Sequence, residues 1–265
     1  MMRPGLFRDD LPALLALLIP VIWRAQGDPW LGPRLALCLI VVFGWQALFA
    51  RLRGQGLSLH GAATAALVAL FVPDTAPHWQ LVIGLSFGVV LGEAVFGGRG
   101  RSFVQPVVLT LAFLIFSFAD QPYRAGPELP LWTALPAVVV LIATGQAPVG
   151  TVLGAAAGLA GLSWLTGADP LAPLMSGALM SGALVLAVLY LTADPVTSGA
   201  TAAGRWICGL LAGGTAALFA TAGPAFGALV FATLLTSVFA PLIDHLALAV
   251  QVARLRRRER RLRHG

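Results

Sequence analysis

The segment Leu191–Trp206, LTADPVTSGATAAGRW, is a polar turn between two long apolar runs, Ser176–Leu191 and Trp206–Ala222. It contains Asp194, and an Asp-Pro pair that ends the preceding helix because Pro195 has no amide proton to donate. This pattern predicts two membrane helices joined by a turn at the bilayer surface. An acid near a membrane helix is costly to place, so the turn is a candidate functional site, with an ordinary inter-helix loop as the alternative.

The composition indicates an all-α integral membrane protein. Hydrophobic residues make up 58% of the 265 residues and charged residues 11%, with a mean hydropathy of +0.87. A soluble domain typically has about 45–50% apolar and about 25% charged residues. The first apolar run starts near Leu11, behind Arg3 and Arg8, and lacks a small-residue cleavage site, so we interpret it as a span rather than a signal peptide.

Ten apolar runs predict about ten transmembrane helices, and several are shorter than the roughly 20 residues that a span needs. We therefore expect some helices to be tilted or broken. Residues 1–248 would form a single multi-span membrane domain, followed by a basic cytoplasmic tail at 249–265. The runs lie near residues 10–24, 35–50, 58–73, 79–97, 103–119, 131–145, 148–165, 174–193, 206–222 and 225–248.

The arginines predict that both termini lie in the cytoplasm. All 17 basic residues are Arg, and with the N-terminus inside, all except Arg24, Arg34 and Arg124 fall on the cytoplasmic side. We therefore expect a multi-pass protein of the bacterial-type cytoplasmic (inner) membrane. The basic tail predicts a cytoplasmic anchor with some contact to anionic lipid, and it does not indicate a nucleic-acid site.

Two segments have a similar order of features and suggest two related halves. In Ser86–Pro106 and in Ser181–Trp206, a glycine-bearing helix leads into an acid, a small-residue turn and an Arg. Transport folds often have duplicated halves with a site at broken helices.

Rows of glycine at every fourth position predict close helix packing. The rows are Gly84, Gly88 and Gly92 in one run and Gly150, Gly154 and Gly158 in another. Room for a flat cofactor ring is the alternative interpretation.

The first of the two similar segments carries an acid within its apolar run. A buried Glu93 implies a partner, and Arg99 and Arg101 are the nearest basic residues. Gly97 and Gly98 allow a sharp bend that can present backbone amides to an anion such as a phosphate. We therefore treat Gly97, Gly98, Arg99 and Arg101 as candidate cofactor-binding residues, with a structural loop as the alternative.

Asp244, in FAPLIDHL, is the third acid of interest, because it ends the last apolar run. An acid that caps a helix end beside the basic tail can be merely structural, and a functional acid is the alternative. No metal site is predicted, because Cys38 and Cys208 lie inside apolar runs without ligand spacing. No catalytic triad, P-loop, haem or iron–sulfur pattern is present either, so no catalytic residues are assigned.

Three blocks, Leu81–Phe118, Leu174–Gly213 and Ala228–Leu246, resemble the NqrB/RnfD family in order and approximate spacing. They contain the FGG turn, the DPVT turn and the PLID sequence. The family comprises the large membrane subunit of the Na+-pumping NADH:quinone reductase and of the Rnf electron-transport complex. The resemblance implies a non-autonomous subunit of a membrane oxidoreductase, with coupling to Na+ or H+ translocation as a hypothesis. In that picture Glu93, Asp194 and Asp244 are the candidate ion-coupling or structural acids. Other membrane and peripheral redox subunits would be its partners.

The flavin motifs of the family are missing. Members carry FMN esterified to a Thr in a DxxSGAT sequence, and the corresponding region Ala119–Pro148 has none; a GSxGETS-like motif is absent too. An SGAT does occur at Ser198–Thr201, but Asp194 is one residue too far away and the turn is expected on the cytoplasmic side. We interpret Thr201 as a chance match and expect FMN or riboflavin to be bound non-covalently or not at all. The family Asn before Pro106 is replaced by Gln105.

Two other functions stay open. A small-solute or ion permease on the same fold would explain the missing flavin motifs, and it would move solute without flavin. A cofactor-free membrane scaffold would instead co-purify with a flavin-bearing partner.

Overall fold

The computed structural model describes residues 4–53, 58–98, 100–165 and 181–264, and regular structure in these ranges is helical apart from an isolated bridge between Pro130 and Ser181. The first half contains α1 (Pro4–Gly27), α2 (Leu31–Arg53), α3 (His60–Phe71), α4 (His78–Val89), the π-helix η1 (Val90–Ala94), α5 (Pro106–Ser117) and the 3₁₀ turn η2 (Pro122–Arg124). The second contains α6 (Leu131–Ala143), α7 (Val149–Leu165), α9 (Gly182–Ala187), the π-helix η3 (Val188–Thr192), α10 (Ala202–Ala220) and α11 (Ala225–His264).

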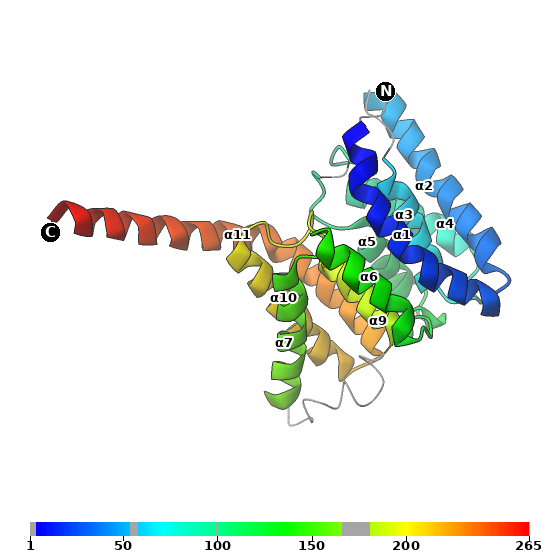
Figure 1. Ribbon diagram of the computed structural model, residues 1–265. Helices are drawn as coiled ribbons and strands as arrows, with labels where there is room; N and C mark the ends of the chain where they lie inside the picture. Colours follow the sequence, from blue (N-terminus) through cyan, green and yellow to red (C-terminus); the bar gives the residue numbers. More distant parts are fainter. Residues whose placement is uncertain (1–3, 54–57, 99, 166–180, 265) are drawn as a thin grey trace.

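Most of the helices pack together in one group, which we call the body, and two further helices form a pair at its side (Figure 1). The body surrounds α3 and α5, with α1, α2, α4, α6 and α9 about them, while α7 and α10 pack against each other at one side. The long α11 packs along α10 and against α5 and α9, then continues beyond the body.

Each of the ten apolar runs contains a helix, but the helices differ in length. Among the described residues, four helices are long and apolar enough to cross a bilayer: Asp10–Gly27, Leu31–Arg53, Ala202–Ala220 and Ala225–Ala253. α3, α5 and α6 have only 12 or 13 residues, or about 20 Å, against about 30 Å of hydrocarbon. The chain is thus an all-helical membrane protein, and several of its helices are as short as the apolar runs indicate.

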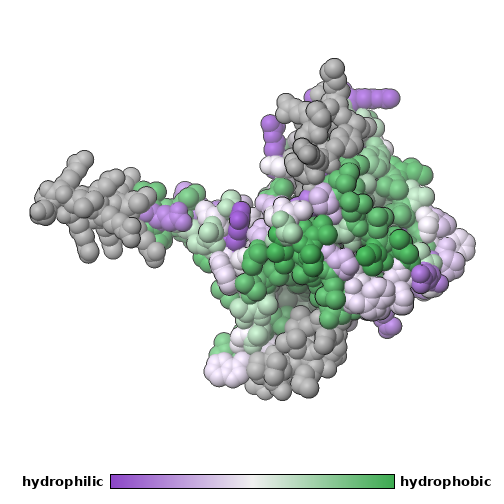
Figure 2. All heavy atoms as spheres, in the orientation of Figure 1, coloured by the Kyte–Doolittle hydropathy of each residue, from purple (hydrophilic) through white to green (hydrophobic). Residues whose placement is uncertain are grey.

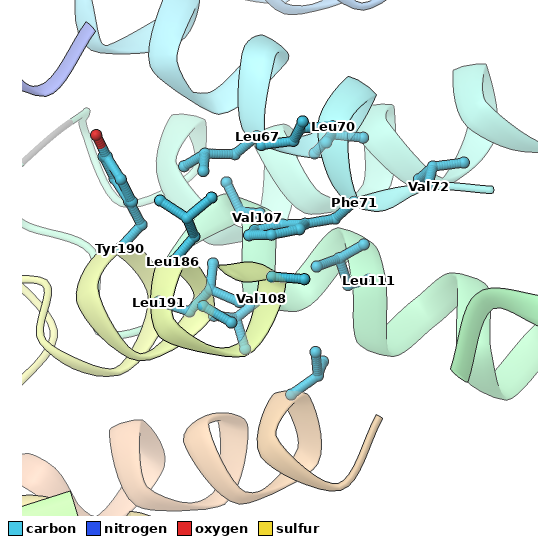
Figure 3. Close-up of a cluster of buried hydrophobic side chains, with 14 of the residues drawn as sticks. Leu67, Leu70, Phe71, Val72, Val107, Val108, Leu111, Leu186, Tyr190 and Leu191 are labelled. Atoms are coloured by element: carbon cyan, nitrogen blue, oxygen red, sulfur yellow. The ribbon is translucent and has the colours of Figure 1, made fainter. Parts of the chain in front are cut away.

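The outer surface and the interior are both apolar, as expected for a protein solvated by lipid. Figure 2 shows wide hydrophobic areas on the face of the body. Inside, the cluster in Figure 3 brings together side chains of α3, α5 and the α9–η3 segment, including Phe71, Val107 and Leu186. These three short elements meet at the centre of the body.

The two glycine rows are packing surfaces. A Cβ added at Gly88 would lie 2.6 Å from the carbonyl oxygen of Pro106 in α5, and one added at Gly154 would lie 2.8 Å from that of Trp206 in α10. Only a hydrogen side chain allows backbones this close. The structural interpretation is therefore confirmed, and a flat ring has no room against these two glycines.

The C-terminal end of the buried α3 is bonded by two arginines. Arg34 donates to the carbonyl of Ala69 (3.1 Å), and Arg24 donates to that of Val72 (2.8 Å). Asp28 accepts from Arg34 at 2.5 Å, so the cluster includes an acid. A buried helix end needs such partners because its last carbonyls have none within the helix. Two of the three arginines assigned to the outer side thus hold a helix end.

Candidate functional site

Two helices of the body end in the same uncommon way. α4 passes into η1 and α9 passes into η3, each a five-residue π-helix. The amide of Val95 bonds to the carbonyl five residues earlier at 2.9 Å, and the amide of Ala193 does so at 2.8 Å. Short π-helical segments are rare in proteins, and those that occur are often found at functional sites. The similarity between the two sequence segments therefore has a structural counterpart.

Each π-helical end carries a buried acid. Glu93 lies within η1 and Asp194 lies two residues after η3, and both residues are only 7% exposed. The Thr197 hydroxyl donates to Asp194 Oδ2 at 3.1 Å, and the Ser198 amide donates to its backbone carbonyl at 2.9 Å. Asp194 therefore begins the DPVT turn and is hydrogen-bonded to Thr197 and Ser198 within it.

The turn after Glu93 depends on glycine. Gly97, Gly98 and Gly100 have φ values of 103°, 94° and 94°, in the left-handed region that other residues avoid. The expected sharp bend is confirmed. Arg101 is exposed, while Arg99 lies outside the described residues.

An arginine from α2 also bonds this first turn. Arg53 donates to the carbonyls of Ala94 (2.7 Å) and Val95 (3.1 Å) at the end of η1. From the sequence, Arg53 is predicted only to lie on the cytoplasmic side of the membrane. Its position 41 residues before Ala94 gives no signal of the contact.

The second turn is held by Asp244. Its Oδ2 accepts from the Ala200 amide at 2.7 Å, and its Oδ1 accepts from the Thr201 amide at 3.0 Å and the Thr201 hydroxyl at 2.8 Å. The Thr201 hydroxyl in turn accepts from the Gly204 amide at 2.9 Å and so caps the N-terminus of α10. The SGAT and PLID sequences thus form one clamp, which we call the Asp244 clamp.

Arg205 completes this turn from the first helical turn of α10. Its Nε donates to the Gly199 carbonyl at 3.2 Å. A Cβ at Gly199 would lie 2.7 Å from the Arg205 amide, so the turn folds tightly back on the helix that it precedes.

Gln105 connects the two halves. Its Nε2 donates to the carbonyl of Tyr190 in η3 at 2.8 Å, and Gln105 is 3% exposed. The Tyr190 hydroxyl donates to the carbonyl of Ala13 in α1 at 2.7 Å. This buried connection was not predicted, although the replacement of the family Asn had marked Gln105 as unusual.

The predicted site residues therefore form two groups. Glu93, Gly97, Gly98 and Arg101 belong to the first turn, and Asp194, Thr201 and Asp244 belong to the second. Among the residues that the structure describes, no three His, Cys, Asp or Glu side chains are grouped as a metal site would require.

The model of the NQR2, RnfD, RnfE family matches residues 10–133 and 126–252. The chain belongs to this family. The matched ranges contain both π-helical ends, both turns and the Asp244 clamp. Membership of the NQR2, RnfD, RnfE family confirms the resemblance inferred from the FGG, DPVT and PLID blocks.

Curated relatives share this similarity over most of the chain. A subunit of the Na(+)-translocating NADH-quinone reductase from Azotobacter vinelandii is 28% identical over 86% of this chain and 70% of its own length. A protein of the same name from Pseudomonas aeruginosa is 29% identical with the same coverage. One from Klebsiella pneumoniae is 27% identical over 81% of this chain and 65% of its own length.

Proposed function

We propose that this protein is the membrane subunit of an electron-transfer complex that couples electron flow to ion translocation. The observation that carries the proposal is the family match, which extends from residue 10 to residue 252 and includes both acid-bearing turns. The relatives named for Na+ translocation and NADH-quinone reduction support this role and imply redox subunits as partners.

The buried acids are the proposed ion-coupling groups. Glu93 and Asp194 are each 7% exposed at helix ends in a membrane protein, where a buried ionisable side chain is a candidate functional group. Asp244 differs, because it is only partly buried and its carboxylate holds the turn at Ala200 and Thr201. We therefore assign coupling to Glu93 and Asp194 first, and to Asp244 through the turn that it holds.

A flavin, if one is used, would be bound non-covalently. The Thr201 hydroxyl already donates to Asp244 and accepts from Gly204, and an ester at this oxygen would remove the donated hydrogen bond. Esterification would thus work against the cap of α10. The test is in-gel flavin fluorescence of the denatured protein, produced with a flavin transferase, beside a Thr201→Ala variant. A fluorescent band lost in the variant would contradict the proposal.

The coupling role is tested in inverted membrane vesicles that contain the complete complex. We expect Asp194→Asn to lower NADH-driven Na+ uptake at least about tenfold, equivalent to about 1.4 kcal/mol of barrier, because the carboxylate charge is lost. Asp120→Asn, at an exposed acid between α5 and η2, is the matched control and should keep wild-type uptake.

Equal uptake by the two variants at equal abundance would contradict the assignment of Asp194. Uptake that continues unchanged in vesicles lacking this chain would contradict the proposed function as a whole.

The topology is also a proposal. Ten spans with both termini in the cytoplasm are supported by a helix in each apolar run and by the arginine distribution. Reporter fusions after Arg53 and after Ala220 are expected to report the cytoplasm and the opposite side respectively. The reverse result would contradict the orientation.

A further inference from the structure

The last helix is longer than a membrane span. α11 has 40 residues, about 60 Å, and its apolar part alone, residues 225–253, has 29 residues, about 44 Å. The hydrocarbon layer of a bilayer is only about 30 Å thick. Part of the apolar stretch must therefore extend past the hydrocarbon layer unless the helix is strongly tilted.

The Asp244 clamp marks where this part begins. α10 and α11 are packed neighbours joined by a short connection at 221–224, and Asp244 bonds to Thr201, which directly precedes α10. Beyond Asp244, α11 has no part of α10 beside it. Figure 1 shows the end of α11 standing clear of the other helices. We call residues 245–264 the C-terminal arm.

The arm combines exposed apolar side chains with a strong charge. Leu246, Leu248 and Val250 are about half exposed, at 57%, 49% and 51%. The following residues 254–264 include seven of the 17 arginines and one of the 11 acids, so they carry the whole net charge of +6. The rest of the chain is neutral by the same count.

We propose that the C-terminal arm binds the anionic phospholipid headgroups of the bilayer from which α11 emerges. A basic segment directly after a span lies within reach of the surface potential of anionic lipids, and exposed Leu and Val next to Arg are typical of helices in the membrane interface. The apolar part of the arm joins the transmembrane part without a break, so the surface that it needs is continuous with the bilayer.

The helix also contains a residue that permits the required change of direction. Pro241 lies three residues before Asp244 within α11, and a proline inside a helix removes a hydrogen bond and favours a bend. A bend at this point lies three residues before Asp244, so it sets the angle at which the clamped end of α11 and the arm after it leave the preceding part of the helix. An acidic partner protein would have to offer an apolar surface beside its negative charge. An anionic bilayer has both the negative charge and the apolar layer.

The experiment uses the full chain in nanodiscs with an environment-sensitive thiol dye at Val250→Cys. The native Cys38 and Cys208 are each 1% exposed and should remain unlabelled. We expect the dye emission to shift to the blue when roughly one lipid in three is phosphatidylglycerol rather than phosphatidylcholine. The shift should disappear at about 1 M salt, where the screening length falls to about 3 Å.

Matched variants distinguish the effect of charge in the arm from the effect of charge elsewhere on the protein. Arg257→Gln with Arg258→Gln should reduce the shift by about half or more, because surface attraction scales with the number of basic residues. Arg51→Gln with Arg124→Gln removes the same charge at exposed sites of the body and should leave the shift intact. A dye at Leu218→Cys, exposed near the other end of α10, should not respond to headgroup charge.

Three results would overturn the proposal. One is identical emission in the two lipids, and another is a shift that persists at high salt and in the Arg257–Arg258 variant. The third is a dye that becomes shielded only when redox subunits are co-produced, which would assign the arm to a protein partner.

Discussion

The turn after η1 and the turn after η3 begin alike, with a π-helical end and a buried acid, but they are held in different ways. The first needs left-handed backbone at Gly97 and Gly98 and is bonded from outside by Arg53. The second has no positive φ, even at Gly199 and Gly204, and is held by the carboxylate of Asp244. Two segments with similar features can thus be stabilised differently, one by glycine backbone and the other by a side chain distant in the sequence.

The largest effect is expected from Asp244→Asn. The amide NH₂ would face either the Ala200 or the Thr201 donors, so at least one hydrogen bond to a charged acceptor is replaced by a repulsive contact. We expect a loss of about 3 kcal/mol in the free energy of unfolding, measured by denaturation in mixed micelles. Asp120→Asn, exposed and without such bonds, should change it by less than about 0.5 kcal/mol. A small effect at both positions would mean that the second turn does not depend on the clamp.

The next effect tests the glycine dependence of the first turn. Gly98→Ala places a Cβ on backbone with φ 94° and should cost about 1–2 kcal/mol. Gly44→Ala, in α2 with no atom within 4 Å of the added carbon, should be neutral or slightly stabilising because alanine favours helix. Thermal unfolding monitored by size-exclusion fluorescence compares the two. If Gly98→Ala is as stable as Gly44→Ala, the first turn does not require its left-handed backbone.

A smaller effect is expected where the two halves join. Gln105→Leu removes the donor to the Tyr190 carbonyl and should cost about 1 kcal/mol, the net value of one hydrogen bond. Hydrogen exchange should increase in η3 more than in η1, because the lost bond ends on η3. Gln26→Leu, at an exposed position of α1, is the control. Equal exchange in η1 and η3 would contradict a specific link to the second half.

The smallest effect concerns the cap on η1. Arg53→Gln removes hydrogen bonds that are exposed to solvent, so the expected cost is about 0.5 kcal/mol. Arg51→Gln, also exposed on α2, has the same charge change without a bonded carbonyl and serves as the matched control. Denaturation as for Asp244→Asn measures both. A cost above that of Gly98→Ala would reverse the comparison and make Arg53 the principal support of the first turn.

The apolar runs predicted the helices well, because burial in lipid requires every backbone polar group to be bonded within a helix. The helix lengths did not follow from the runs: α3 ends at Phe71 although the apolar run continues to Pro73. Pro73 favours this end locally, because the residue before a proline avoids helical angles, and Arg24 and Arg34, far away in the sequence, bond the carbonyls at the end of the helix. The π-helical ends were likewise not predicted, although both acid-bearing segments were recognised as similar.

The sequence by itself determined that this is a helical membrane protein, that its family is the one whose FGG, DPVT and PLID blocks it carries, and that two acids follow similar helices. Amino-acid composition and the order of residues within short segments are enough for these conclusions. The tertiary structure alone decided that Asp244 holds the SGAT turn across 43 residues, that Arg53 bonds the end of η1, and that Gln105 joins η3. Such contacts depend on where helices stop and cross, and the spacing of residues along one chain does not specify that.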